Sequence, residues 1–326
     1  MFSYRSLLRQ AWEITWKHKY LWFFGLFATL VAGGGSWEYQ IITQNLNQSM
    51  VDGSYFRLSG ILALGEIVKN FCLGLVSLLQ YDFWTVINAL TILLLSLFLL
   101  AFFVWLAITC QAALVWDVKK IANSKKKDLT LSIREGLTAG HRYFWQIFSL
   151  NLLTKVLISF LLFIASLPLL FMVLSDTPLL ATTYVVLFII FIPAAMGLSL
   201  MIKYAIAYQV LDNKSFVSAI EAAEKLFRKN WLISLEAAII LFIINFLASG
   251  VLLIVMALIL LPLLLLGLIF QLSWLVILTI LLAIIIIVFF GSALTTFQTA
   301  TWTNLFLTLK DKGGIAKLER LFQRGN

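Results

Sequence analysis

Charged residues and proline are scarce in this chain of 326 amino acids. Only 12% of the residues are Asp, Glu, Lys or Arg, whereas soluble domains carry about 25%, and 62% are hydrophobic. This balance excludes an ordinary water-soluble domain. Only four prolines interrupt the chain, and its apolar runs lack the alternation that a membrane barrel strand shows over roughly ten positions. The composition therefore predicts an all-α integral membrane protein.

Cysteine and histidine, which often carry chemistry, are also rare. Cys72 and Cys110 form no CxxC pair, so neither a disulfide framework nor a thiolate metal site is expected. His18 and His141 stand beside basic residues and supply no ligand cluster, and we interpret both as polar residues of the membrane interface. The sequence has no P-loop, HExxH or GxSxG motif. We therefore expect no catalytic residue, no metal and no cofactor, and an intramembrane enzyme has no residues to support it.

Long apolar stretches are abundant instead. A membrane span needs about 20 predominantly apolar residues, and six stretches qualify: residues 19–34, 86–114, 147–174, 180–207, 234–264 and 273–305. The apolar run 237–291 is too long for one span, and Gln271 and Ser273 predict a turn within 267–273 that divides it into a hairpin. The expected fold is a six-span helical bundle.

Lys and Arg indicate how this bundle is oriented. Twenty of the 24 basic residues lie in four segments that six spans would place on one side: residues 5–19, 119–142, 214–229 and 310–324. Because cytoplasmic loops carry an excess of Lys and Arg, both termini are predicted to be cytoplasmic. The expected location is the cell membrane, that is, the plasma or inner membrane, with the chain crossing it several times.

The stretch Leu58 to Leu79 is the one further segment apolar enough to be taken for a seventh span. Its apolar residues recur at helical spacing, while Glu66, Lys69 and Asn70 occupy another face. If this stretch crossed, the first basic cluster would lie on the opposite side from the other three. We interpret it as an interfacial helix on the outer surface, and the sequence leaves a re-entrant segment open as the alternative.

Three amphipathic segments precede the first, third and fifth spans. Ser132 and Glu135 have the spacing of a helix capping box at the start of the second one. The second, fourth and sixth spans end alike, because Asp117, Asp212 and Asp311 are each followed closely by Lys. We predict one membrane domain, 1–326, with three repeats of an amphipathic helix and a hairpin: about 1–118, with an outer insertion at 36–85, then 129–212 and 214–311, and an amphipathic tail at 312–326.

A family resemblance rests on the third repeat. The segment AIEAAEKLFRKNW (Ala219 to Trp231) follows YAIAYQVLDNKSF (Tyr204 to Phe216) and enters a long apolar hairpin. This arrangement resembles the membrane domain attached to some bacterial glycerophosphoryl diester phosphodiesterases, and related stand-alone bacterial membrane proteins. The likeness covers nearly the whole chain in architecture. No part of the sequence resembles the soluble catalytic barrel of those enzymes, so the resemblance implies no hydrolytic activity here.

Ionisable residues inside spans are candidates for function because they are costly in lipid. Lys155, Lys203 and Glu236 qualify, and Lys155 is the deepest and the best candidate for an intramembrane functional residue. All three lie toward the predicted cytoplasmic ends of their spans, where snorkelling or structural pairing is the favoured interpretation. In the basic run 119–128, Lys125, Lys126 and Lys127 are candidate contacts for anionic lipid, at about 1 kcal/mol per residue.

Two functions remain in competition. The favoured hypothesis is a non-enzymatic membrane module, a scaffold or lipid-organising protein linked to phospholipid metabolism. The alternative is a small-solute or lipid transporter, which the repeats, Lys155 and the intramembrane prolines Pro168, Pro193 and Pro262 would suit. The expected partners are membrane lipids, including anionic headgroups at the cytoplasmic face. The net charge of +9 does not predict a nucleic-acid partner, since orientation already explains the basic loops.

Overall fold

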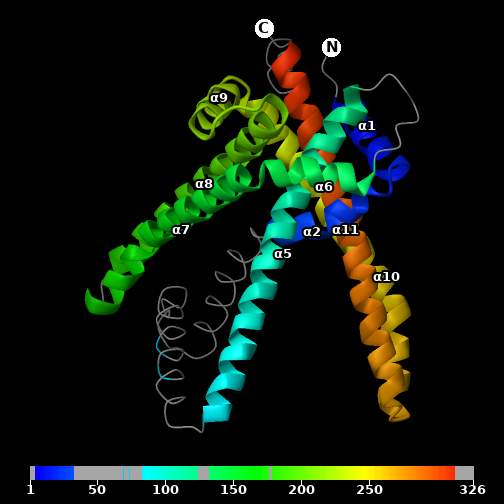
Figure 1. Cartoon of the computed structure of the whole chain (residues 1–326). Helices are drawn as coiled ribbons and strands as arrows, with labels where there is room; N and C mark the ends of the chain where they lie inside the picture. The colour runs from blue at the N-terminus through cyan, green and yellow to red at the C-terminus, as the bar shows by residue number, and fades with distance from the viewer. Residues whose placement is uncertain are drawn as a thin grey trace. The chain divides into compact units, whose positions relative to one another are not determined.

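The computed structural model of the chain describes residues 4–32, 69, 73, 83–123, 132–175 and 178–312, and these are almost entirely helical (Figure 1). The helices are α1 (Tyr4–Lys17), α2 (Leu21–Ala32), α5 (Phe83–Asn123), α6 (Ile133–Arg142), α7 (Phe144–Ser175), α8 (Pro178–Asp212), α9 (Phe216–Lys229), α10 (Trp231–Ile269) and α11 (Ser273–Lys312). No strand occurs in this part of the chain. The predicted all-α class is confirmed for the residues that the structure describes.

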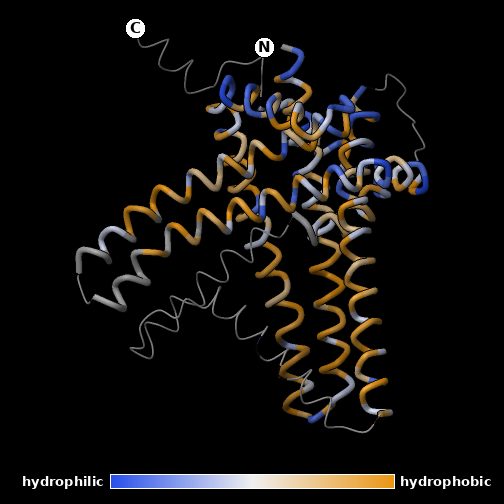
Figure 2. The backbone as a smooth tube through the Cα atoms, turned by 60° about the vertical axis from the view of Figure 1, so that its left-hand side comes forward, coloured by the Kyte–Doolittle hydropathy of each residue, from blue (hydrophilic) through white to orange (hydrophobic). Residues whose placement is uncertain are grey.

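Five described helices are long and apolar enough to cross a membrane: α5, α7 over Phe144–Leu161, α8 over Val185–Asp212, α10 and α11. Figure 2 shows them as hydrophobic along most of their length. The protein is therefore a multi-pass membrane protein. Helix α2 is described over Leu21–Ala32, and residues 33–68 lie outside the described part of the chain. The sixth span near 19–34 stays a prediction, and nearly all of the Leu58 to Leu79 stretch lies outside the described residues.

The chain divides into two compact units. Unit 1 comprises Met1–Val31, Ala107–Leu150 and Leu200–Asn326; unit 2 comprises Ala32–Leu106 and Asn151–Ser199. In unit 2 the described parts of α5, α7 and α8 expose large apolar side chains such as Phe98 and Ile189, which suits contact with lipid. Unit 1 contains α1, α6 and α9, which we call the short helices, together with most of α2 and most of the buried polar residues.

Helices α10 and α11 of unit 1 form the hairpin that the sequence predicts. Helix α10 ends at Ile269 and α11 begins at Ser273, so the turn falls at Gln271. Gln271 has a positive φ of 53°, and the Leu272 N–H donates to the Gly267 carbonyl at 2.8 Å, which is the arrangement that commonly closes a helix. This turn lies far from the short helices in Figure 1.

Each short helix leads directly into a longer or more apolar helix. The breaks fall at residues 18–20 between α1 and α2, at Tyr143 between α6 and α7, and at Asn230 between α9 and α10. At each of them a break residue still donates to the preceding turn: His18 N–H to Ile14, Tyr143 N–H to Gly140 and Asn230 N–H to Leu226, all at 3.1 Å. We call these three breaks the junctions.

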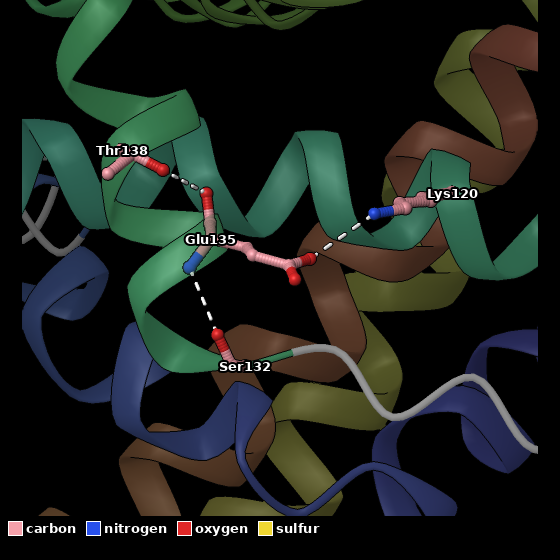
Figure 3. Close-up of polar contacts among 4 residues, drawn as sticks. All are labelled: Lys120, Ser132, Glu135 and Thr138. Carbon is pink, nitrogen blue, oxygen red and sulfur yellow. Dashed lines mark hydrogen bonds and ion pairs between the residues drawn. The ribbon is translucent and has the colours of Figure 1, made fainter.

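The start of α6 carries the cap that the sequence predicts. The Ser132 hydroxyl accepts a hydrogen bond from the Glu135 N–H at 3.3 Å (Figure 3). A serine in this place satisfies a backbone donor that the first helical turn would otherwise leave without a partner. The Thr138 hydroxyl then donates to the Glu135 carbonyl at 2.9 Å. Local sequence therefore fixes where α6 begins.

Small residues let the helices of unit 1 approach closely. A Cβ on Gly140 of α6 would collide with the Thr109 carbonyl oxygen of α5, and a Cβ on Gly25 of α2 would collide with the Ser292 carbonyl oxygen of α11. The fully buried residues Ala11 of α1 and Ala223 of α9 are also small. Backbone contact through small side chains is a usual way for membrane helices to pack.

Helix α2 lies steeply across α11. The Thr296 hydroxyl of α11 donates to the Leu21 carbonyl at 3.2 Å, and Thr295 shares a hydrogen bond of 2.8 Å with Thr29. Two positions eight residues apart on α2 thus reach adjacent residues of α11. A helix that ran alongside α11 would instead contact residues well separated along it.

Helices α8, α10 and α11 of unit 1 share an aromatic core. Tyr204 of α8 is buried, and its hydroxyl shares a hydrogen bond of 2.7 Å with Ser234 of α10. The ring of Phe306 in α11 lies 6.3 Å from the Tyr204 ring and 4.8 Å from the Tyr208 ring. The late turns of α8 and α11 are therefore held at one level.

The glycine contacts predict which glycines matter for stability. Gly25→Ala and Gly140→Ala should each destabilise the protein by about 1–3 kcal/mol, because the added methyl group forces two helix backbones apart. Gly250→Ala and Gly291→Ala are matched controls, since no atom lies within 4 Å of a Cβ built there, and they should be neutral or stabilise by up to about 1 kcal/mol. Thermal unfolding in nanodiscs measures the difference, and equal melting temperatures in the two pairs would contradict the packing.

Candidate functional site

The three junctions carry the same kinds of residue. Exposed basic side chains come first, and an aromatic residue follows: Lys17, Lys19 and Tyr20 at the first junction, Arg142 and Tyr143 at the second, and Arg228, Lys229 and Trp231 at the third. Tryptophans near each junction are exposed, with Trp16 at 46%, Trp145 at 73% and Trp231 at 56%. Basic residues beside exposed tryptophan are typical of the boundary between membrane and water.

Polar contacts hold the first and second junctions in place. The Trp22 indole N–H of α2 donates back to the Thr15 carbonyl of α1 at 2.9 Å. The Tyr143 hydroxyl donates to Asn213 at 2.5 Å, and Asn213 has a positive φ of 52°, which Asn tolerates better than most residues. The link between α8 and α9 is thereby tied to the junction between α6 and α7.

The two histidines lie at these junctions and supply no ligand cluster. Burial lowers the pKa of His18, and the positive charge of Lys17 lowers it further, so that the imidazole is neutral at pH 7. His141 is exposed in the last turn of α6. Among the described residues no group of three or more His, Cys, Asp or Glu comes together as metal ligands would.

Lysines tie the ends of α5, α8 and α11 together. Lys119 of α5 donates to the Leu211 carbonyl of α8 at 2.5 Å. Lys310 of α11 donates to both carboxylate oxygens of Asp212 in α8 at 2.7 Å. Some of the Asp and Lys residues at the predicted span ends therefore form contacts between helices. Asp117 forms no ion pair of this kind.

Five side chains have buried polar atoms without a hydrogen-bond partner among the described residues: Tyr20, Thr109, Asp117, Gln209 and Asn304. Three of them are Asp117 of α5, Gln209 of α8 and Asn304 of α11, with exposed fractions of 0%, 0% and 4%. Each of these three lies four residues after a completely buried alanine, namely Ala113, Ala205 and Ala300. We call these three the buried polar positions.

The buried polar positions do not all coincide with the three aspartates on which the predicted repeats were aligned. The sequence comparison aligned Asp117 with Asp212 and Asp311, whereas burial groups Asp117 with Gln209 and Asn304. Because the three residues differ in type, only their shared place four residues after a small residue could have revealed them. The repeat itself stays a prediction.

None of the intramembrane candidates from the sequence is one of the buried polar positions. Lys155 lies in α7 of unit 2 and is exposed. Lys203 of α8 is exposed and its ammonium group stands 4.6 Å from the centre of the Trp302 ring, a cation–π contact. Glu236 of α10 accepts a hydrogen bond from the Tyr4 hydroxyl of α1. The candidate lipid contacts Lys125, Lys126 and Lys127 lie outside the described residues.

Comparisons of the chain with models of protein families, with curated proteins and with solved structures give no match. The resemblance to the membrane domain of glycerophosphoryl diester phosphodiesterases stays a prediction from the sequence.

Because the buried amide of Gln209 has no hydrogen-bond partner, its removal is expected to stabilise the protein. Gln209→Met should stabilise the protein by about 1 kcal/mol, because it removes a buried amide that makes no hydrogen bond. Gln298→Met is the matched control: its amide donates to Asn245 at 2.6 Å, and its loss should destabilise by about 1 kcal/mol. Thermal unfolding of both variants tests this, and a loss of stability in Gln209→Met would show that its amide has a role.

Proposed function

We propose that this chain is a non-enzymatic membrane module that binds the headgroups of anionic phospholipids at the cytoplasmic face of the cell membrane. In this role it organises lipid or acts as a scaffold, in connection with phospholipid metabolism. The single observation that carries the proposal is the recurrence of exposed basic and aromatic residues at all three junctions of unit 1.

The chemistry of the junctions fits a phosphate headgroup. Lys19, Arg142 and Lys229 are exposed, and each belongs to a short stretch that also carries aromatic residues. Such cations attract anionic lipid by about 1 kcal/mol each near the membrane surface. Exposed tryptophan rings prefer the headgroup level, where one edge is apolar and the other is wet. Together they provide both an electrostatic and an apolar reason to hold lipid.

The short helices have the shape of surface elements rather than spans. Helix α1 buries Leu7, Ala11 and Ile14 while Arg5 and Arg9 are exposed. Helices α6 and α9 follow the same rule, burying only small residues on one side. A short helix with one buried face and a charged face suits a position in the plane of the membrane boundary. Figure 2 shows hydrophilic residues gathered around these helices.

A second candidate function is the transport of a small solute or a lipid. The observation that favours it is the set of buried polar positions. Polar side chains inside the membrane often mark a substrate pathway, and a bound substrate would supply the hydrogen bonds that these side chains lack. The amide of Gln209 and that of Asn304 could bind a polar solute in this way. Flux measured in proteoliposomes distinguishes this candidate from a module that only binds lipid.

The junction residues provide a direct test of lipid binding. A triple variant with Lys19→Gln, Arg142→Gln and Lys229→Gln should lose roughly 3 kcal/mol of attraction, which is about 100-fold in affinity for phosphatidylglycerol or cardiolipin. Native mass spectrometry of the protein released from nanodiscs of defined composition counts the bound lipids. Binding of the zwitterionic lipid phosphatidylethanolamine should change much less.

A charge-matched control separates position from net charge. Arg9→Gln, Arg134→Gln and Lys225→Gln remove the same charge from exposed places within α1, α6 and α9. This control should retain most of the anionic lipid that the unmutated protein binds. Equal losses in the two triple variants would mean that the junctions are not binding sites and would refute the proposal.

A further inference from the structure

Asp117 is the one carboxylate in the described residues that is wholly buried without a hydrogen-bond partner. Its exposed fraction is 0%, and neither of its oxygens accepts a hydrogen bond. An ionised carboxylate in such a place has lost its hydration without gaining hydrogen bonds or an ion pair, which is strongly unfavourable. No described residue makes a direct contact that would neutralise this group.

Tyr20 is close enough to Asp117 for the two groups to interact electrostatically. The hydroxyl of Tyr20, between α1 and α2, is also buried and has no hydrogen-bond partner among the described residues. Burial raises the pKa of Tyr20 well above its usual range, and the carboxylates of Asp117 and Glu135 raise it further. Tyr20 therefore keeps its proton. The ring of His18 lies 6.1 Å from the Tyr20 ring, and His18 is neutral at pH 7.

Lys120 is the cation among the described residues that lowers the pKa of Asp117, and it is already engaged elsewhere. Lys120 lies on the same helix and contacts Glu135 of α6 at 3.4 Å (Figure 3). The Lys120 ammonium also stands 4.7 Å from the centre of the Trp116 ring. Glu135 adds a second negative charge facing Asp117. The contacts of Lys120 thus leave the Asp117 charge without a direct ion pair.

The packing around Asp117 is too tight for a large ligand. A Cβ on Gly136 of α6 would lie 3.0 Å from Asp117 Oδ2 and 2.6 Å from the ring of Phe24 in α2. The glycine therefore brings the backbone of α6 directly against the carboxylate. The described residues also contain no set of three or more metal-binding side chains. A proton needs no additional space, so it can neutralise the carboxylate without moving a helix.

We propose that Asp117 is a proton-binding site at the contact between α5, α6 and α2, with Tyr20 as its neighbouring hydroxyl. Proton binding forms the carboxylic O–H, removes the net charge and lets α6 rest on the end of α5. Ionisation leaves a charge beneath α6 and loosens this contact. Because the folded protein binds this proton more tightly than the unfolded chain, stability should fall as pH rises. The site is independent of the lipid-binding junctions.

Infrared spectroscopy of the full chain in vesicles tests the site. The unmutated protein should show the C=O band of a protonated carboxyl group at pH 7, and selective ¹³C labelling of aspartate should shift that band. Asp117→Asn, which preserves size, should abolish it, while Glu13→Gln at an exposed carboxylate of α1 should leave it unchanged. Tyr20→Phe should shift the band without abolishing it.

Three outcomes would overturn the proposal. The band is absent from the unmutated protein at pH 7, the aspartate label fails to shift it, or it persists in Asp117→Asn. A sodium series, with a large organic cation as the replacement, separates proton from metal. Loss of the band on adding sodium would mean that a metal cation, not a proton, occupies Asp117. The labelling result needs no mutation, so it decides the question even if a variant fails to fold.

Discussion

Close contact between a small residue of one helix and the backbone of another holds unit 1 together. Gly140 of α6, packed against α5, and Gly25 of α2, packed against α11, are the clearest cases, because any side chain at either place would collide with a carbonyl oxygen. Lipid gives helices no hydrophobic reason to associate, so packing of this kind must supply the attraction. The positions of the junctions, and the burial of Asp117 under α6, both follow from these contacts.

Much of the fold could be predicted from the sequence because membranes impose simple rules. The all-α class, the turn at Gln271 and the cap at Ser132 each follow from a local pattern, and each is found. The first span could not be decided in this way. Its apolar stretch is adequate, and the described helix Leu21–Ala32 contacts α11 through threonine hydrogen bonds that no hydropathy pattern predicts.

The candidate site was predictable only in part. Basic and aromatic residues near Lys19, Arg142 and Lys229 are visible in the sequence, because charge at membrane boundaries is a local property. The buried polar positions are not, since a polar residue near a span end is expected to face water. Only the packing of α6 and α2 shows that Asp117 is enclosed instead. Lys155 was predicted as a functional residue because it lies deepest within its predicted span. Depth in the membrane does not reveal which side chains surround a residue.

The central claim is that all three junctions lie at one membrane boundary, on the cytoplasmic side. Single cysteines at Lys19, Arg142 and Lys229, in a background with Cys72→Ser and Cys110→Ala, test it most directly. In oriented vesicles each should react with a membrane-impermeant thiol reagent from the cytoplasmic side only, and spin labels at the same places should report headgroup depth. Reaction of any one of them from the opposite side would contradict the account.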